Sequence, residues 1–339
     1  MKHFTSSIVI TIIGLVAAYY WAGLSGLALV AILAVMETSL SFDNAVVNAT
    51  VLRDMEPRWQ RRFLTWGMIV AVFGVRFLLP ILIVAVVSGQ SLIAVSRMAL
   101  EAPDDYARHL AASHVQISAF GGMYLLLVFF SFLFQKGKSL HWVVWLERRL
   151  SQMGKLESIE IVLALAILLT AQYVLPLEEK LDALVAGVCG VILFVLIKSI
   201  SDLFNQTEGA SPARRRSGLV SFLYLELLDL SFSFDGVVGA FAITRDVVII
   251  LLGLTIGAWF VRSLTVFLVR KRTLDEYLYL EHGAHYAIGA LALLMLLNMS
   301  VHVPETVTGL IGIGFILMSF WSSVRHNRCQ RQKPAPAPE

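Results

Sequence analysis

Long apolar runs separated by short polar segments make up most of this chain of 339 residues. Each run can cross the roughly 30 Å hydrocarbon core of a bilayer. Backbone groups in lipid must be paired within their own segment, so these runs must be helices. The pattern predicts about ten transmembrane helices, at residues 4–22, 24–52, 63–88, 115–134, 157–175, 181–204, 217–243, 247–269, 283–301 and 305–323. The expected fold class is therefore all-α, a polytopic membrane helix bundle.

Charge and composition agree with this topology. Only 15% of residues are charged and 58% are hydrophobic, whereas soluble domains have about 25% charged residues. Of the 27 Lys and Arg, 20 fall in alternate connecting segments on the side of the C-terminal tail, and four fall on the other side. The positive-inside rule then places both termini in the cytoplasm. Membrane topology explains the net charge of +3, so the bilayer and not a nucleic acid is the expected partner.

The polar segments contain no soluble domain. Residues 141–149 and 273–281 combine aromatic and charged side chains and predict helices lying along the interface. We divide the chain into a first membrane half at 1–175, a second at 176–324 and a disordered cytoplasmic tail at 325–339. The absence of a long loop argues against a nucleotide-driven pump. A homo-oligomer is left open.

The two halves share an internal repeat. Residues 39–54 align without a gap with residues 231–246, and seven of 16 positions are identical, including Ser-x-Ser-Phe-Asp and a closing Arg-Asp. Glu37 aligns with Asp229, and further along Gly67 aligns with Gly253 and Arg76 with Arg262. The copies lie in the second and seventh predicted spans and cross the membrane in opposite directions. This predicts an inverted repeat, an arrangement many secondary transporters use.

Five carboxylates lie inside the predicted spans, and these are the candidate functional residues. An Asp at mid-bilayer costs about 2.5–3.5 kcal/mol on the translocon scale, so function is the default interpretation. The candidate ligands of a cation are Glu37, Asp43, Asn44, Glu226, Asp229 and Asp235, with Ser41, Ser233, Arg76 and Arg262 in supporting roles.

Helical spacing places Glu37, Ser41, Asn44 and Asn48 on one polar stripe, and Glu226, Asp229 and Ser233 on another. Asp43 lies six residues after Glu37, and Asp235 lies six residues after Asp229. Six residues correspond to about 240° around an ideal helix. The two aspartates join the stripes only where the helix is interrupted. Gly236 and Gly239 favour an interruption in the second copy, whereas in the first we infer one from the repeat alone.

Oxygen ligands without Cys or His suit hard divalent cations such as Mn²⁺, Ca²⁺ or Mg²⁺. Clustered carboxylates titrate together, so protons are the expected counter-ion. The chain is expected to have no bound cofactor other than the transported ion. The alternative, that Arg76 and Arg262 pair with two acids for structure alone, stays open. Gly253-x-x-x-Gly257 indicates close helix packing. His282 and His285 lie at the cytoplasmic mouth of the ninth span, where they anchor the interface or sense pH.

At its acidic motifs the chain resembles the TerC (tellurium-resistance protein C) family of bacterial membrane proteins. Their motifs appear here as Glu37-Thr-Ser-Leu-Ser-Phe-Asp43-Asn44 and Glu226-Leu-Leu-Asp229-Leu-Ser-Phe-Ser-Phe-Asp235, each one residue longer than in TerC. The sequence is most similar to a sister branch, DUF475, over nearly its whole length. It shares Phe-Asp-Asn-Ala-Val-Val-Asn-Ala-Thr-Val-Leu and the run Leu-Asp-Glu-Tyr-x-Tyr-Leu-Glu-His-Gly-Ala-His with that branch.

The resemblance implies the bacterial inner membrane, a role in metal stress and, by analogy with manganese exporters, the motif acids as ligands. We therefore expect a transporter that exports a divalent cation, with Mn²⁺ favoured, by alternating access. A membrane scaffold for a metal or tellurite stress-response complex is the alternative. An enzyme is not expected, because the chain has no recognised nucleophile or cofactor motif.

Overall fold

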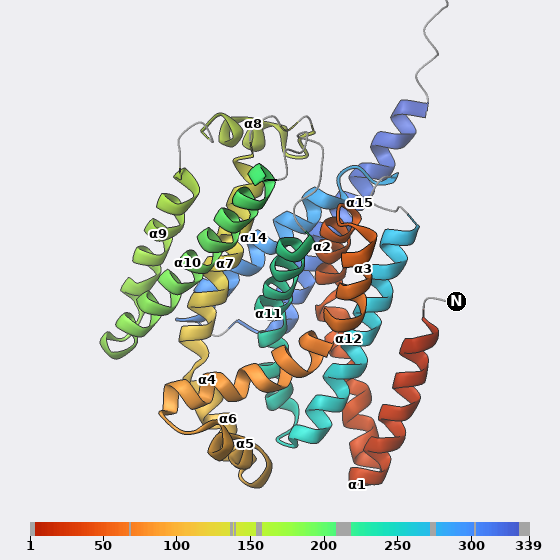
Figure 1. The fold of residues 1–339 in the computed structure, drawn as a ribbon, viewed down its shortest axis with the longest axis vertical. Helices are drawn as coiled ribbons and strands as arrows, with labels where there is room; N and C mark the ends of the chain where they lie inside the picture. Colours follow the sequence, from red (N-terminus) through yellow and green to blue (C-terminus); the bar gives the residue numbers. More distant parts are fainter. Residues whose placement is uncertain are drawn as a thin grey trace, which may run out of the picture.

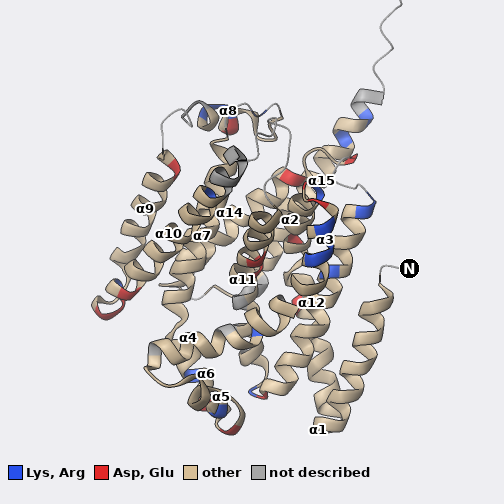
Figure 2. Cartoon of the chain, viewed as in Figure 1, with Lys and Arg blue, Asp and Glu red and all other residues tan. Residues whose placement is uncertain are grey.

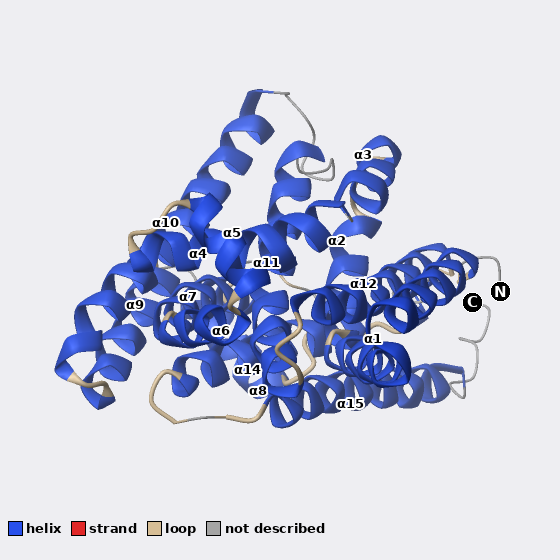
Figure 3. Ribbon diagram, turned by 90° about the horizontal axis from the view of Figure 1, so that it is seen from below, coloured by secondary structure: helices blue, strands red, loops and turns tan. Residues whose placement is uncertain are grey.

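The computed structural model describes residues 4–67, 69–135, 138, 140–153, 158–207, 218–271, 276–301 and 303–331. Within these ranges every regular element is a helix (Figure 3), which confirms the all-α prediction. The first half contains α1 (Thr5–Leu40), α2 (Phe42–Arg53), α3 (Pro57–Arg62), η1 (Phe63–Gly67), η2 (Val70–Leu78), α4 (Leu79–Ser88), α5 (Leu92–Glu101), α6 (Pro103–Ala112), α7 (His114–Leu133), α8 (Val144–Met153), α9 (Ile159–Ala171) and η3 (Gln172–Val174). The second half contains α10 (Leu177–Thr207), α11 (Gly218–Ile243), α12 (Val247–Arg270), α14 (Leu280–Asn298) and α15 (Glu305–Arg331).

The bundle presents apolar side chains outward, as a membrane protein does. Only 17% of the apolar stretch of α1 is buried, against 61% for α7 and 67% for α14. Large side chains such as Tyr20, Leu181 and Trp321 are exposed on α1, α10 and α15. Helices α9 and α10 lie at one edge and α1 at the opposite edge in two views (Figures 1 and 3). The outer surface therefore suits lipid.

Helix α1 turns back on itself at Ala22–Gly23. Gly23 has a φ of 65°, a left-handed conformation that glycine adopts without strain. The contacts with α12 reverse at this point. An added Cβ would lie 2.8 Å from Ile256 at Gly14 and 3.2 Å from Ile249 at Gly26, whereas Leu33, further along α1, lies against Gly253. The chain thus runs along α12 in both directions (Figure 1), and the turn separates residues 4–22 from 24–40 as the two apolar runs do.

Within the described part of the chain, six helices are long and apolar enough to cross a membrane, or seven if the bent pair Pro57–Gly67 and Val72–Val86 is one span. The protein is thus a multi-pass membrane protein, while the figure of ten stays a prediction. Three features of the helices account for the difference between six or seven helices and the predicted ten. Helix α1 counts once despite its turn, α9 is only 13 residues long, and every 18-residue stretch of α11 contains the acids Glu226, Asp229 and Asp235.

The helix is interrupted in the first repeat copy, whereas Gly236 and Gly239 favour an interruption in the second. The helical run breaks at Ser41, between α1 and α2, whereas α11 is continuous from Gly218 to Ile243. The Ser41 hydroxyl donates to Glu37 and the Asp43 carboxylate accepts from the Asn44 N–H. The bond from the Asn44 N–H uses a backbone donor that a continuous helix would otherwise use. Gly236 instead allows close approach, because a Cβ there would lie 2.8 Å from Glu37 Oε2.

Glycines on α12 let the motif helix approach closely. A Cβ at Gly253 would lie 2.5 Å from Leu33 Cβ, and one at Gly257 would overlap Glu37. The predicted packing role of Gly253-x-x-x-Gly257 is therefore confirmed.

Replacing Gly257 with Val is expected to destabilise the protein by about 1–3 kcal/mol through overpacking. Thermal unfolding in detergent measures this. Gly314→Ala is the matched control, because a Cβ there has no atom within 4 Å and helical Ala is favoured over Gly by roughly 0.5–1 kcal/mol. Equal stability of Gly257→Val and the parent protein would contradict the packing role.

Figure 2 shows many of the Lys and Arg gathered at the end of the bundle that contains α8, the C-terminal end of α12 and α15. Helix α8 lies across this end (Figure 1), as expected for an interfacial helix. The other predicted interfacial helix, 273–281, lies partly outside the described residues.

The prediction of a disordered tail from residue 325 is wrong for 325–331, because α15 continues to Arg331. Packing explains the extension: Asn327 Nδ2 donates to Glu276 O, and Ser323 Oγ accepts from Tyr279 N. Residues 332–339 lie outside the described part of the chain.

Candidate functional site

An ion pair joins the two acidic motifs at the centre of the bundle. Arg76 of η2 donates through Nη2 to Glu37 Oε1 at 2.7 Å, and its Nη1 lies 3.8 Å from Asp229 Oδ2. The exposed fractions of these side chains are 2%, 2% and 9% for Arg76, Glu37 and Asp229. Glu37 belongs to the first repeat copy and Asp229 to the second, so a single guanidinium bridges equivalent acids of the two copies.

Arg76 lies in an unusual stretch of helix. Residues 70–78 form the π-helical segment η2, which follows the π-helical η1. Wider π-helical turns inside membrane helices and soluble helices often occur at functional sites. Here the segment packs against α11 and places Arg76 between α1 and α11.

Polar residues of the first copy reach the acid of the second. Asn44 Nδ2 donates to Asp229 Oδ1 at 2.8 Å, and Ser41 Oγ donates to Glu37 Oε1 at 2.9 Å. The break at Ser41 positions this group, because it lies between Glu37 and Asn44 in the chain. Ser41, Asn44, Glu37 and Asp229 therefore form one hydrogen-bonded group around Arg76.

Two further acids are buried without an ion pair among the described residues. Asp43 accepts from the Asn44 N–H at 2.9 Å and lies against Gly312 of α15, where a Cβ would lie 2.8 Å from Oδ2. Glu226 lies against Gly67, where a Cβ would lie 2.5 Å from Oε1. Neither oxygen of Glu226 has a hydrogen-bond partner among the described residues. The two motifs thus contain four buried carboxylates, of which Glu37 and Asp229 face the buried guanidinium of Arg76.

The remaining predicted site residues are placed differently. Arg262 donates through Nε to Leu64 O at 2.7 Å, so the equivalent arginines contact different groups. Ser233 is buried, and its hydroxyl has no partner among the described residues. Asp235 belongs to α11, but its side chain lies outside the described residues. The structure therefore brings Glu37, Ser41, Asn44, Asp229 and Arg76 together and leaves Arg262 outside this group.

Two small cavities lie beside Arg76, each with a volume of about 20 Å³. By this measure a water molecule needs about 10–15 Å³, so each cavity has room for one or two waters. The first faces α5 and α6 and is lined by Arg76, Phe77, Ile81, Ala99, Tyr106, Val237, Phe241, Val247, Ile250 and Leu251. The second is lined by Asn48, Phe63, Leu64, Gly67, Arg76, Asp229, Ala258, Val261, Arg262 and Thr265.

The described side chains do not form a closed metal centre. No three His, Cys, Asp or Glu among them are arranged to hold a metal ion. Arg76 occupies the space between Glu37 and Asp229, which accounts for the separation of these two acids. Binding of a cation by both acids would require the guanidinium to withdraw.

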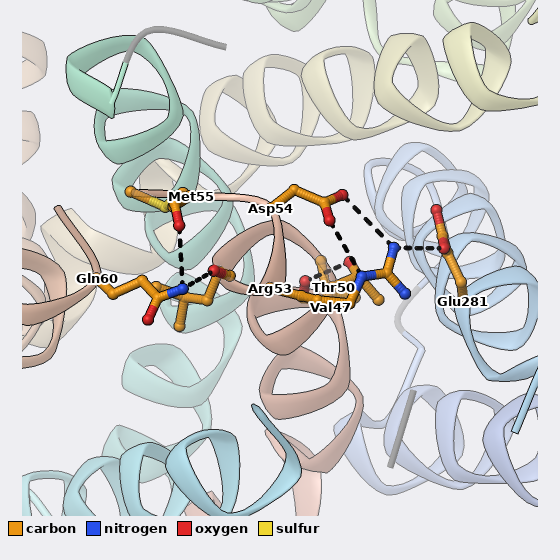
Figure 4. Close-up of polar contacts among 8 residues, drawn as sticks. Val47, Thr50, Arg53, Asp54, Met55, Gln60 and Glu281 are labelled. Carbon is orange, nitrogen blue, oxygen red and sulfur yellow. Dashed lines mark hydrogen bonds and ion pairs between the residues drawn. The ribbon is translucent and has the colours of Figure 1, made fainter. Parts of the chain in front are cut away.

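A contact network holds the C-terminal end of α2. Arg53 Nε donates to Asp54 Oδ1 at 3.1 Å and its Nη2 donates to Glu281 Oε2 of α14 at 3.2 Å (Figure 4). Gln60 Nε2 donates to the carbonyls of Leu52 and Met55. The Arg-Asp pair that closes the first repeat copy thus anchors the motif helix to its neighbours.

A second buried polar cluster lies under α8 and was not predicted. Glu147 is fully buried and lies 3.2 Å from Lys138 Nζ and 3.5 Å from His282 Nε2, while Tyr286 donates to it at 3.3 Å. Burial raises the pKa of Glu147, but the hydrogen bond with His282 and the charge of Lys138 outweigh it and hold the pKa at about 2. A charged residue next to arginines in an interfacial segment ordinarily indicates a solvated face, so the sequence offered no signal for burial.

Glu147→Gln is expected to loosen α8. The folded-state pKa is depressed, so the ionised carboxylate stabilises the fold above a pH of about 4.5 and the contribution fades as pH falls toward about 2. Removing the charge at neutral pH should raise amide hydrogen exchange over residues 141–150 by about tenfold, since local opening governs exchange. Glu101→Gln, at an exposed acid, is the control. Unchanged exchange in Glu147→Gln would contradict an anchoring role.

These features define the class of protein: a multi-pass helical membrane protein with a charged group buried between two related motifs. The family model described as "Protein of unknown function (DUF475)" matches residues 42–330, so the chain belongs to the DUF475 family. No curated protein and no solved structure matches the chain. The relation to TerC proteins stays a prediction.

Proposed function

We propose that this protein is a transporter that exports a divalent metal cation, with Mn²⁺ favoured, by alternating access in the bacterial inner membrane. One observation carries the proposal. Glu37 of one half and Asp229 of the other are buried on either side of Arg76, and each motif contributes a further buried acid, Asp43 or Glu226. One guanidinium neutralises one of these charges, and the excess of carboxylates favours a cation or protons.

Contacts between equivalent positions support an inverted relation of the halves. Asn44 contacts Asp229, and its equivalent Gly236 lies against Glu37, the equivalent of Asp229. Val72 packs against Ala258, its own equivalent in the repeat. A residue that contacts its own equivalent lies near a twofold axis. In the full proposal, ten spans form two inverted halves, with both termini in the cytoplasm.

The ligand chemistry supports a hard cation. The site offers carboxylate, amide and hydroxyl oxygens, the donors preferred by Mn²⁺, Ca²⁺ and Mg²⁺. Protons would return in exchange, because a carboxylate that releases a cation inside low-dielectric protein is stabilised by protonation.

Ion flux into proteoliposomes tests the proposal. Asp43→Asn removes a charge while its side-chain oxygen still accepts from the Asn44 N–H, so the fold should persist. Flux of Mn²⁺ is expected to fall at least tenfold in Asp43→Asn combined with Asp235→Asn, with Ca²⁺ and Mg²⁺ measured alongside. Asp182→Asn is the matched control, because Asp182 accepts from Gln116 away from the site. Equal flux in the double variant and the control would overturn the proposal and favour a membrane scaffold.

A further inference from the structure

The repeat assigns each arginine an equivalent neighbour. The alignment that pairs Gly67 with Gly253 and Arg76 with Arg262 also pairs Leu64 with Ile250. Arg262 donates to Leu64 O. The equivalent contact, related by the pseudo-twofold axis of the repeat, would join Arg76 to Ile250, and these two residues line the same cavity, the one facing α5 and α6.

The two equivalent arginines make different contacts in the present arrangement. Arg76 occupies the space between Glu37 and Asp229, whereas Arg262 contacts a backbone carbonyl. Yet Arg262 lines a cavity together with Asp229, so an acid of the group faces the same space. Two guanidinium groups repel each other, so the acid pair accommodates one of them at a time.

From this placement we infer that Arg76 and Arg262 exchange places between two conformations of the protein. In the conformation described here Arg76 neutralises Glu37 and Asp229 and Arg262 rests on Leu64 O. In the other, Arg262 neutralises the acids and Arg76 rests on Ile250 O. The inference deepens the proposed function, since the two conformations are those of alternating access.

The physical reason for two conformations is their similarity in energy. The arginines are equivalent and so are the two acids, so the same kind of ion pair forms in each conformation, and interconversion needs states that differ by only a few kcal/mol. The cavities on the two sides of Arg76 have the same volume, about 20 Å³. During exchange the acids lose one guanidinium before gaining the other, and a divalent cation can bind them in that interval.

Cysteine labelling measures the exchange directly. Ala99→Cys reports on the cavity facing α5 and α6, and Thr265→Cys reports on the other cavity. Each is introduced singly into a chain whose Cys189 and Cys329 are replaced by serine. The rate of reaction with a small methanethiosulfonate reagent is measured, and the ratio of the rate at position 265 to that at position 99 gives the conformational balance.

Arg262→Gln should hold the protein in the described conformation, and Arg76→Gln should hold it in the other. The ratio is expected to differ at least tenfold between the two variants, whereas Arg149→Gln, at an exposed arginine of α8, should leave it unchanged. Equal ratios in Arg76→Gln and Arg262→Gln would overturn the inference. Should Arg76→Gln fail to fold, Arg76→Lys and Arg262→Lys replace the pair, because Lys keeps the charge but loses the planar fork.

The labelling needs no ion flux, so the two proposals fail separately. A ratio difference in a protein that moves no cation would overturn transport and leave the exchange standing. Cation flux with equal ratios would overturn the exchange and leave transport standing.

Discussion

With Arg262 already replaced by glutamine, so that no second guanidinium can take its place, replacing Arg76 with glutamine is expected to destabilise the protein by about 3–5 kcal/mol, because it leaves buried charge without a partner. Glu37 and Asp229 are at least nine-tenths buried and both face Arg76. Unfolding of the purified protein in mixed detergent micelles measures the effect. Arg97→Gln is the matched control, since Arg97 and Glu101 form an exposed pair 3.9 Å apart and such pairs contribute about 0–1 kcal/mol.

A double-mutant cycle in the same background separates the ion pair from the general effect of a core substitution. Glu37→Gln also removes charge from the pair, so Arg76→Gln combined with Glu37→Gln should destabilise less than the two single effects added together. Contacting residues in one network show coupling of about 0.5–3 kcal/mol. Additive single effects, or an Arg76→Gln variant as stable as Arg97→Gln, would show that the bridge seen between the motifs is not formed.

Glu226→Gln is expected to reduce cation flux at least tenfold while leaving stability unchanged or slightly raised. Neither oxygen of Glu226 has a hydrogen-bond partner among the described residues, although the residue is buried. A buried carboxylate without partners is unfavourable, so this acid has the most to gain from a bound cation or proton. Since glutamine nearly preserves its shape, a loss of flux at unchanged stability reports on charge and not on folding.

The control for this experiment is Glu160→Gln, which neutralises an acid paired with Lys198 at 2.6 Å on the periphery of the bundle. Flux and thermal unfolding are measured on the same preparations. Full flux in Glu226→Gln would remove Glu226 from the cation path. A fall in flux that follows a fall in unfolding temperature would assign it to packing instead.

The regular helices were predictable because lipid leaves the backbone few alternatives. The predicted span 115–134 corresponds to α7 (His114–Leu133), and the predicted span 247–269 corresponds to α12 (Val247–Arg270). The turn at Ala22–Gly23 fell between two predicted runs. The π-helical stretch around Arg76 was not predictable, since it depends on which side chains of α11 pack against it.

The sequence alone determined that the chain is a helical membrane protein and which polar residues are too costly to bury without a purpose, because hydropathy and desolvation act residue by residue. Tertiary structure decided which of two equivalent arginines meets the acids, which motif helix breaks and that Glu147 is buried. Each of these depends on contacts between helices that lie far apart in the sequence. Because the two motif copies have similar sequences, only the packing of the helices decides which copy makes a given contact.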